Sequence, residues 1–350
     1  MEPYEKPKHT DDFTEEERVS LRPSGRIFSV AVIVGAILYG IVMLMIFQAL
    51  GASAKGDVAT AAFLVFVPLG IGVISTFAIP ADKRTIRNVV SLAIMVTFFY
   101  MITAGIMFSG LWLCLLMIAP FAIGIAVIGA LVVKVFRWWW QRGPWETEKK
   151  KRQYVFVGFL LILPLLITPI ESSAPPPNWI REVTDSIVIA GTPEIVWNNI
   201  IRMDTISPEE QRPSFYHTMG IPRPIRAQLD QEAVGGIRQG EFEFGLMFYE
   251  TITVWEPNET VRFTVDVHQN PQSSPVLMQI GGKYFDITEA GYQIEEVDAE
   301  HVRLTLNSTY RLSTNFNFYG AFWSDWIMHD FQSYVLQTVK NRVENHNQKS

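Results

Sequence analysis

The sequence has almost no cysteine, because Cys114 is the only one in 350 residues. A single thiol excludes an internal disulfide, and it excludes the paired or clustered cysteines of zinc and iron–sulfur sites. Cys114 lies within a long apolar run, where a lone thiol is typical of a small packing residue. The six histidines are scattered, without a second histidine or carboxylate at ligand spacing. The sequence therefore predicts no metal site and no cofactor.

Basic residues are scarce in the second half of the chain. Residues 178–350 carry 13 Lys and Arg against 23 Asp and Glu, whereas residues 1–177 carry 16 against 12. A nucleic-acid surface needs clustered Lys and Arg to neutralise phosphates. The acidic balance therefore excludes nucleic acid as a partner of the second half, and no pattern in the sequence identifies a protein partner.

Charge is also missing from the middle of the apolar runs, of which there are five. A helix needs about 20 residues to cross the hydrocarbon layer, and four of the runs reach that length. The fifth has 17 residues, the lower limit of a span, and contains Pro164 and Pro169. The runs cover Ile27–Leu50, Val58–Ile79, Asn88–Phe108, Leu111–Val133 and Tyr154–Ile170. They predict an α-helical transmembrane bundle.

The bundle offers little sign of transport. Proton and ion pathways are usually marked by ionisable residues within the membrane, and none lies in the middle of a run. Pro68 and Pro120 could break their helices, as in some transporters. The small residues near them favour close helix packing instead.

Basic residues between the runs predict the orientation of the bundle. They precede the first run, follow the second and follow the fourth, which places these segments in the cytoplasm. Residues 1–26 are polar and predict a disordered cytoplasmic tail with no cleaved signal peptide. With five spans the C-terminal half is extracytoplasmic, and it is cytoplasmic if Tyr154–Ile170 does not cross. We therefore expect an integral membrane protein in the cell membrane.

Residues 171–180 form a proline-rich linker that holds the next domain near the bilayer. Beyond it, short alternating segments predict antiparallel strands, with Thr192 and Pro193 opening a short helix. The region from Ser207 to Gly220 predicts a second short helix or irregular turn. The strands are expected over Val183–Ala190, Ile225–Leu229, Ile237–Phe244, Met247–Trp255, Val261–His268, Tyr284–Glu295 and His301–Ser313.

The last element is a long helix over Gly320–Asn345, whose apolar residues recur at helical spacing. A sheet with one apolar face needs a cover, and this helix provides it. The predicted fold over residues 181–345 is α+β, with a strongly curved antiparallel sheet around the helix and a cavity between them.

The order of these elements resembles the START-like (SRPBCC) superfamily, the helix-grip group of polyketide cyclases, lipid-transfer domains and the birch-pollen-allergen fold. The resemblance covers about residues 181–344 and is carried by the segments IVIAGTPEIVWNNI and VGGIRQGEFEFGLMFYETITVWEPNETVRFTVD and by the long aromatic helix. It implies a cavity for lipids, sterols, polyketides or other hydrophobic molecules. The superfamily has no shared catalytic motif, so the resemblance transfers no catalytic residue, and it leaves the membrane half unexplained.

The candidate cavity residues come from this sequence alone. Six aromatic residues are expected to line the cavity: Phe242, Phe244, Phe263, Tyr310, Trp326 and Phe331. Glu250 shares its strand face with Phe248 and Ile252, so it is expected to point inward, unless the face of Tyr249 and Thr251 is the inner one. A carboxylate in an apolar cavity has a raised pKa and can act as a general acid or base.

Three functions remain open. The leading hypothesis is a membrane-anchored domain that binds or senses a hydrophobic ligand, a lipid or polyketide-like molecule, at the extracytoplasmic surface. The second is a cyclase or dehydratase that uses the same cavity, with Glu250 as its candidate catalytic residue. The third is a transport or signalling bundle regulated by the soluble domain, which the missing intramembrane charge disfavours. The sequence favours binding over catalysis.

Overall fold

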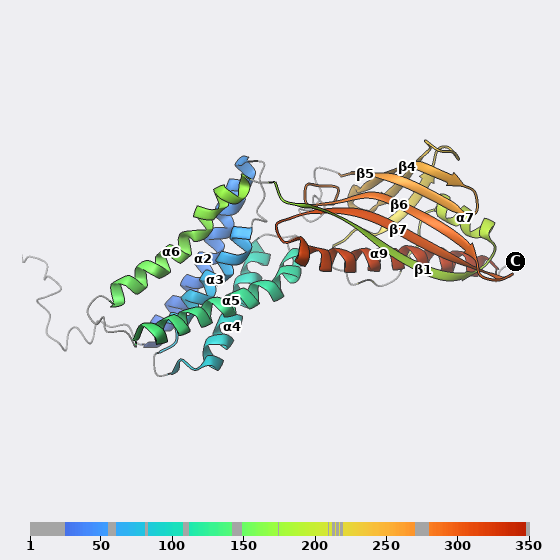
Figure 1. Ribbon diagram of the computed structural model, residues 1–350. Coiled ribbons are helices and arrows are strands. Elements are labelled where there is room, and N and C mark those ends of the chain that lie inside the picture. Colours follow the sequence, from blue (N-terminus) through green and yellow to red (C-terminus); the bar gives the residue numbers. More distant parts are fainter. Residues whose placement is uncertain are drawn as a thin grey trace, which may run out of the picture. The chain divides into compact units, whose positions relative to one another are not determined.

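The computed structural model describes residues 25–54, 61–80, 83–107, 112–141, 149–173, 175–208, 210–211, 214, 217, 220–269 and 280–347. Residues 1–24 of the expected tail, most of the turn after Ser207 and most of the loop after Gln269 lie outside these residues. The last two residues assigned to the tail, Gly25 and Arg26, are instead the first two of a helix. The chain falls into two compact units whose main boundary lies between Ser173 and Ala174. The first is helical, and the second contains the sheet and the last helix (Figure 1).

The helical unit contains α2 (Gly25–Ala54), α3 (Ala61–Phe77), α4 (Ile86–Met107), α5 (Trp112–Gln141) from Ile118 onward, and α6 (Lys149–Ser172). Among the described residues, Ile27–Ala49, Ile86–Met107 and Trp112–Phe136 are long and apolar enough to cross a membrane. Two further apolar helices, Ala61–Phe77 and Val155–Glu171, are shorter. In the run expected over Val58–Ile79 the helix ends at Phe77, two residues earlier than predicted. A physical reason is Pro80, which disfavours helical backbone at the residue before it.

Small residues bring α3 and α5 into close contact. A Cβ on Gly72 would lie 1.8 Å from the carbonyl oxygen of Ala126, and one on Gly129 would lie 2.3 Å from that of Leu69. Both helices continue through their internal prolines, Pro68 and Pro120. The structure therefore agrees with the packing role expected for these glycines.

Hydrogen bonds connect the ends of α2 and α6 to the two ends of α3. Ser29 at the start of α2 donates to the carbonyl of Ala78, just beyond the end of α3, at 2.6 Å. At the other end of α3, the Glu171 carboxylate accepts hydrogen bonds from the backbone N–H groups of Ala61 and Ala62, the latter at 2.8 Å. The carboxylate satisfies donors that a helix start leaves unpaired. The start of α3 and the end of α6 therefore lie side by side, and the two helices run in opposite directions.

The second unit is built on a seven-stranded sheet with the order β1-β7-β6-β5-β4-β3-β2. Every neighbouring pair is antiparallel. The strands are β1 (Asn178–Ala190), β2 (Pro224–Leu229), β3 (Ile237–Phe242), β4 (Met247–Glu256), β5 (Thr260–His268), β6 (Phe285–Glu296) and β7 (His301–Ser313). The sheet curves over the long helix α9 (Asn317–Asn347) (Figure 1). The short helix α7 (Pro193–Ile201) packs against the C-terminal half of α9. The predicted curved sheet around a C-terminal helix is confirmed.

Local sequence explains where the strands begin and bend. β1 begins at Asn178, directly after the last of three prolines, which cannot donate to a ladder. A bulge between Ile252 and Val254 changes the face that the rest of β4 presents. Trp255 consequently packs edge-on against Trp197 of α7, with ring centroids 5.0 Å apart.

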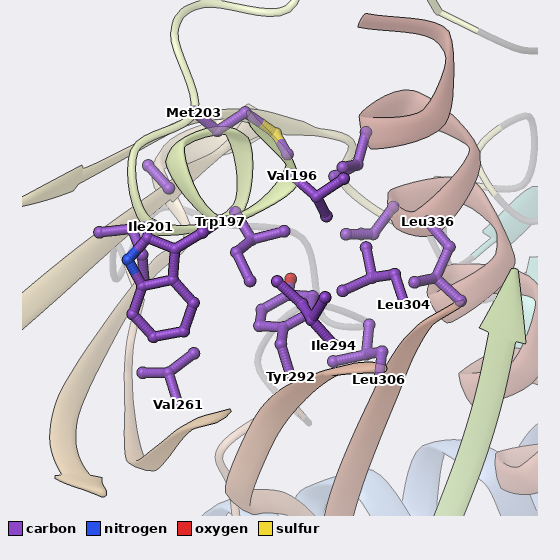
Figure 2. Packing of buried hydrophobic residues seen from close by; sticks show 14 of the residues in the cluster. Val196, Trp197, Ile201, Met203, Val261, Tyr292, Ile294, Leu304, Leu306 and Leu336 are labelled. Atoms are coloured by element: carbon purple, nitrogen blue, oxygen red, sulfur yellow. The ribbon is translucent and has the colours of Figure 1, made fainter. Parts of the chain in front are cut away.

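The core lies between the sheet, α7 and α9. Figure 2 shows Trp197 and Ile201 of α7 and Leu336 of α9 around the inner residues of β6 and β7. A second cluster, which includes Phe242, Phe248 and Tyr310, fills the other end of the sheet. The two clusters join α9 to the sheet along its length.

Candidate functional site

A pocket lies between the inner face of the sheet and α9, and we call it the sheet–helix pocket. Its volume is about 60 Å³. Strands β2 to β7 form most of its wall, and Met328, Phe331 and Val335 close it from α9. The other lining residues are Met203, Pro224, Arg226, Ala227, Arg238, Gly240, Phe242, Phe248, Glu250, Phe263, Val265, Ile287, Ala290, Tyr292, Leu306 and Ser308. Apolar side chains dominate, so the charged pair within the wall stands out.

That pair is Arg238 on β3 and Glu250 on β4. The two residues are direct partners in the antiparallel ladder, so both side chains point to the same face. The guanidinium Nη1 donates to Glu250 Oε2. The side chains are only 7% and 11% exposed, so the ion pair is removed from water.

Three further groups hold the guanidinium in place. Its Nε donates to the carbonyl of Ile201, the last residue of α7, at 3.3 Å. A cation is favourable there, because the end of a helix carries partial negative charge. The guanidinium carbon also lies 5.7 Å from the ring centroid of Phe263, within cation–π range. Arg238 interacts in addition with the hydroxyl of Tyr292.

Arg238, Glu250 and Tyr292 form a polar cluster in an apolar wall. Burial by itself lowers the pKa of Arg238, but Glu250 and Tyr292 together raise it above its ordinary value. Burial raises the pKa of the Tyr292 hydroxyl, although Arg238 acts in the opposite direction. Both groups therefore keep their protons, and the cluster can supply hydrogen-bond donors to a polar atom that enters the pocket.

The structure changes the argument for Glu250 as an acid or base. Glu250 is buried and points inward, and the face of Phe248 and Ile252 is the inner one, as expected. The expected acid–base role assumed purely apolar surroundings. Glu250 instead faces a permanent positive charge on Arg238. Within the described residues there is also no group of three or more His, Cys, Asp or Glu that could hold a metal ion.

The predicted lining residues divide into two sets. Phe242, Phe263 and Phe331 line the pocket together with Glu250. Phe244 and Trp326 are exposed at the surface, and Tyr310 is fully buried beside the pocket, where its hydroxyl donates to Asp325 at 2.6 Å. Phe244 leaves the wall because β3 ends at Phe242 and a 3₁₀ turn with a φ of 59° at Phe244 redirects its side chain.

Sequence reasoning missed Arg238 and Tyr292. A usable signal was present for Arg238, because it lies four residues before Phe242 on the same strand face. Tyr292 likewise shares its face of β6 with Ile294, and both are buried. Which of these polar residues would meet depended on strand register.

The pocket is small for the ligands that the resemblance implies. Pockets for drug-sized molecules measure about 300–1,000 Å³, at least five times the volume found here. A volume of about 60 Å³ holds roughly four water molecules at about 15 Å³ each.

Comparisons with known proteins bear on the fold only. No protein-family model matches this sequence, and no curated protein sequence matches it. Solved structures are similar to its C-terminal half. A START superfamily protein from Mycobacterium smegmatis shares 9% identity, over 47% of this chain and 97% of the other, with a TM-score of 0.33. The ZhuI aromatase/cyclase from Streptomyces sp. R1128 shares 10%, over 47% and 94%, with a TM-score of 0.30.

Norcoclaurine synthase from Thalictrum flavum, in complex with dopamine and hydroxybenzaldehyde, shares 10% identity over 48% of this chain and 89% of the other, with a TM-score of 0.30. Values this low carry no argument about ligand or activity. The fold rests instead on the chain's own strand order and long helix. The C-terminal unit has a helix-grip fold, as the START-like resemblance in its sequence implied.

Proposed function

We propose that this protein is a membrane-anchored helix-grip domain that binds a hydrophobic ligand with one polar group in the sheet–helix pocket. The observation that carries the proposal is a buried polar cluster in a mainly apolar wall. The apolar wall favours the body of such a ligand, and Arg238 and Tyr292 can donate hydrogen bonds to its polar atom. An ordinary packed core has no need of a charged pair that is removed from water.

The size of the pocket restricts the ligand. In its closed form it accepts only a molecule of a few heavy atoms, because its volume is about 60 Å³. A lipid or polyketide-like ligand requires the pocket to widen. We favour widening over a minute ligand, because hydrophobic binding gains free energy in proportion to buried apolar area.

Filling the pocket tests this proposal. Gly240 lies on the pocket wall, and a Cβ there would meet its nearest neighbours at 3.4–3.9 Å, an ordinary contact distance. In Gly240→Val the additional methyl groups extend toward the pocket. The neighbouring Gln239 points outward, so Gln239→Val is the matched control.

Each full-length variant is purified in lipid nanodiscs, and its retained small molecules are extracted and identified by mass spectrometry. We expect a hydrophobic compound to co-purify with the wild type and with Gln239→Val, and to be lost from Gly240→Val. Equal retention by both variants, or no retained compound in the wild type, would refute ligand binding in this pocket.

We also propose that five helices cross the membrane, with the N-terminus in the cytoplasm and the helix-grip domain on the extracytoplasmic side. The basic segments support the orientation. The contact of Glu171 with the start of α3 supports a full crossing by α6, because it pairs opposite ends of two antiparallel helices. The 17 residues of Ala61–Phe77 suffice at the lower limit of a span.

A reporter fused after Ser350 tests this orientation. We expect activity from an enzyme that works only outside the cytoplasm, such as alkaline phosphatase, and no fluorescence from a protein that folds only in the cytoplasm. The same two reporters are also fused after Lys149. If the loop before α6 is cytoplasmic, the phosphatase is inactive there and the fluorescent protein is fluorescent. The cytoplasmic pattern at both positions would mean that α6 does not cross.

A further inference from the structure

The exposed face of α9 changes character along the helix. Its first turns present large apolar side chains to solvent, with Phe318 63%, Phe322 64% and Trp326 48% exposed. These three residues recur at four-residue spacing and form one stripe along about 12 Å of helix, which we call the aromatic stripe. The next exposed residues on this face are polar, His329 and Ser333. The apolar character is therefore confined to one end of the helix.

The start of β1 extends the same apolar surface. Trp179 is 39% exposed and shares its strand face with Arg181 and the buried Val183. Arg181 donates two hydrogen bonds to Asp325 of α9, at 3.0 and 2.6 Å. This bidentate pair fixes β1 beside the aromatic stripe, so Trp179 and the stripe belong to one surface.

That surface lies next to the point where the chain leaves the helical unit. Asn317, the first residue of α9, donates through its side-chain amide to the carbonyl of Pro177 at 2.6 Å. α6 ends at Ser172, so residues 173–177 are the whole connection. Five extended residues reach at most about 17 Å. The covalent chain alone therefore keeps the first turn of α9 within about that distance of the end of α6.

We propose that the aromatic stripe, with Trp179, docks into the interfacial layer of the bilayer that the helical unit crosses. This docking rests on the proposed crossing of α6 but not on ligand binding in the pocket. Aromatic side chains favour the boundary between headgroups and hydrocarbon. The switch from Trp326 to His329 marks the level at which α9 leaves this layer.

The chemistry of the surface selects the kind of lipid contact. Between Asn317 and Trp326 the only charged residue is Asp325, and Arg181 pairs with it. No basic residue of this segment attracts anionic headgroups. The docking is therefore apolar, so neutral phosphatidylcholine suffices and salt has little effect on it.

Site-directed fluorescence on the full-length protein tests the docking. In a Cys114→Ser background, single cysteines replace Phe322 or His329 and carry an environment-sensitive dye. The two positions are seven residues apart on the exposed side of one helix, so His329 is the matched control. The protein is placed in phosphatidylcholine nanodiscs, and the dye is quenched either by spin-labelled lipid or by aqueous iodide. Quenching is measured at low and high salt.

We expect the dye at position 322 to be quenched several-fold more by the lipid than by iodide, and the dye at 329 to show the reverse, at both salt concentrations. Preferential quenching by iodide at both positions would overturn the proposal. Protection of position 322 from both quenchers would also overturn it, because protein would then cover the stripe. A third variant carries the dye at position 326. Its quenching by lipid should be lost when Phe318→Ser and Phe322→Ser are added. An unchanged thermal midpoint shows that the domain of this variant is folded.

Discussion

Replacing Glu250 with Gln should strongly destabilise the helix-grip domain. The substitution keeps the shape of the side chain but removes the negative charge that faces Arg238. The guanidinium cannot lose its proton, and its side chain is only 7% exposed. Glu250→Gln therefore leaves a buried positive charge without its counter-ion.

The magnitude follows from the contacts that remain. Breaking a buried ion pair by removing one partner costs about 3–5 kcal/mol. Arg238 keeps the carbonyl of Ile201, the ring of Phe263 and the hydroxyl of Tyr292. We therefore expect the lower end, a loss of about 3 kcal/mol. With a urea dependence of about 2 kcal/mol per molar, the unfolding midpoint falls by about 1.5 M.

Pulse proteolysis in urea measures this midpoint on the full-length protein in nanodiscs, because protease removes the unfolded domain and leaves the folded one. The sheet provides a matched control in Arg226 and Glu241, a second cross-strand pair that is exposed. Glu241→Gln should cost less than about 1 kcal/mol. Arg238→Met/Glu250→Leu, which removes both charges, should be close to the wild type or more stable. An equal shift for Glu250→Gln and Glu241→Gln would show that the inner pair is hydrated, and the description of the pocket wall would be wrong.

Three further predictions concern polar contacts within each unit. Gln332→Leu should cost about 1–3 kcal/mol in the same assay, because the buried amide donates to the carbonyl of Val183 and to Ser308; Gln337→Leu on the same helix should cost less. Burial raises the pKa of Asp325, but Arg181 and Tyr310 lower it below the ordinary value of 3.8. Its contribution to stability is therefore complete above that pH and lost as the pH falls below it, and an acid titration of Asp325→Asn should show a smaller loss than the wild type. Glu171→Ala should cost about 1 kcal/mol by uncapping α3, which lowers the thermal midpoint of the helical unit in detergent, whereas Glu171→Gln should lower it less.

Most strand positions were predictable because they depend on local alternation, although β1 begins at Asn178, inside the expected linker, rather than at Val183. In β7, Val302, Leu304, Leu306, Tyr310 and Leu312 share one parity in the sequence, and all are buried. The helix expected over Gly320–Asn345 extends to Asn317–Asn347, a small difference because the end turns of a helix fray and are weakly marked in sequence. Both predictions rest on side-chain periodicity, which the sequence carries directly.

The polar cluster was not predictable because it depends on which residues of two strands meet. Arg238 and Glu250 are twelve residues apart, and a shift of one residue in the register of β3 and β4 would turn one side chain away from the other. The turn between the strands sets this register. The positive φ of Phe244 in that turn also interrupts the inward–outward alternation of β3, so the alternation does not extend to Phe244. The volume of the pocket likewise depends on how side chains fill the space, which no periodicity reports.

The attachments of α9 indicate which wall can move to admit a ligand. The helix is bonded to β1 near both ends, through Arg181 to Asp325 and through the N–H of Ala190 to Glu344. Lifting it from the sheet would break these contacts and expose the core between them. The pocket wall formed by β2 (Pro224–Leu229) is held less firmly. Within the described residues this short edge strand has a ladder with β3 alone, supplemented by a bridge between Met203 and Ala227. Displacing β2 loses fewer contacts, so a ligand larger than the closed pocket should enter beside this strand while α9 keeps its place on the sheet.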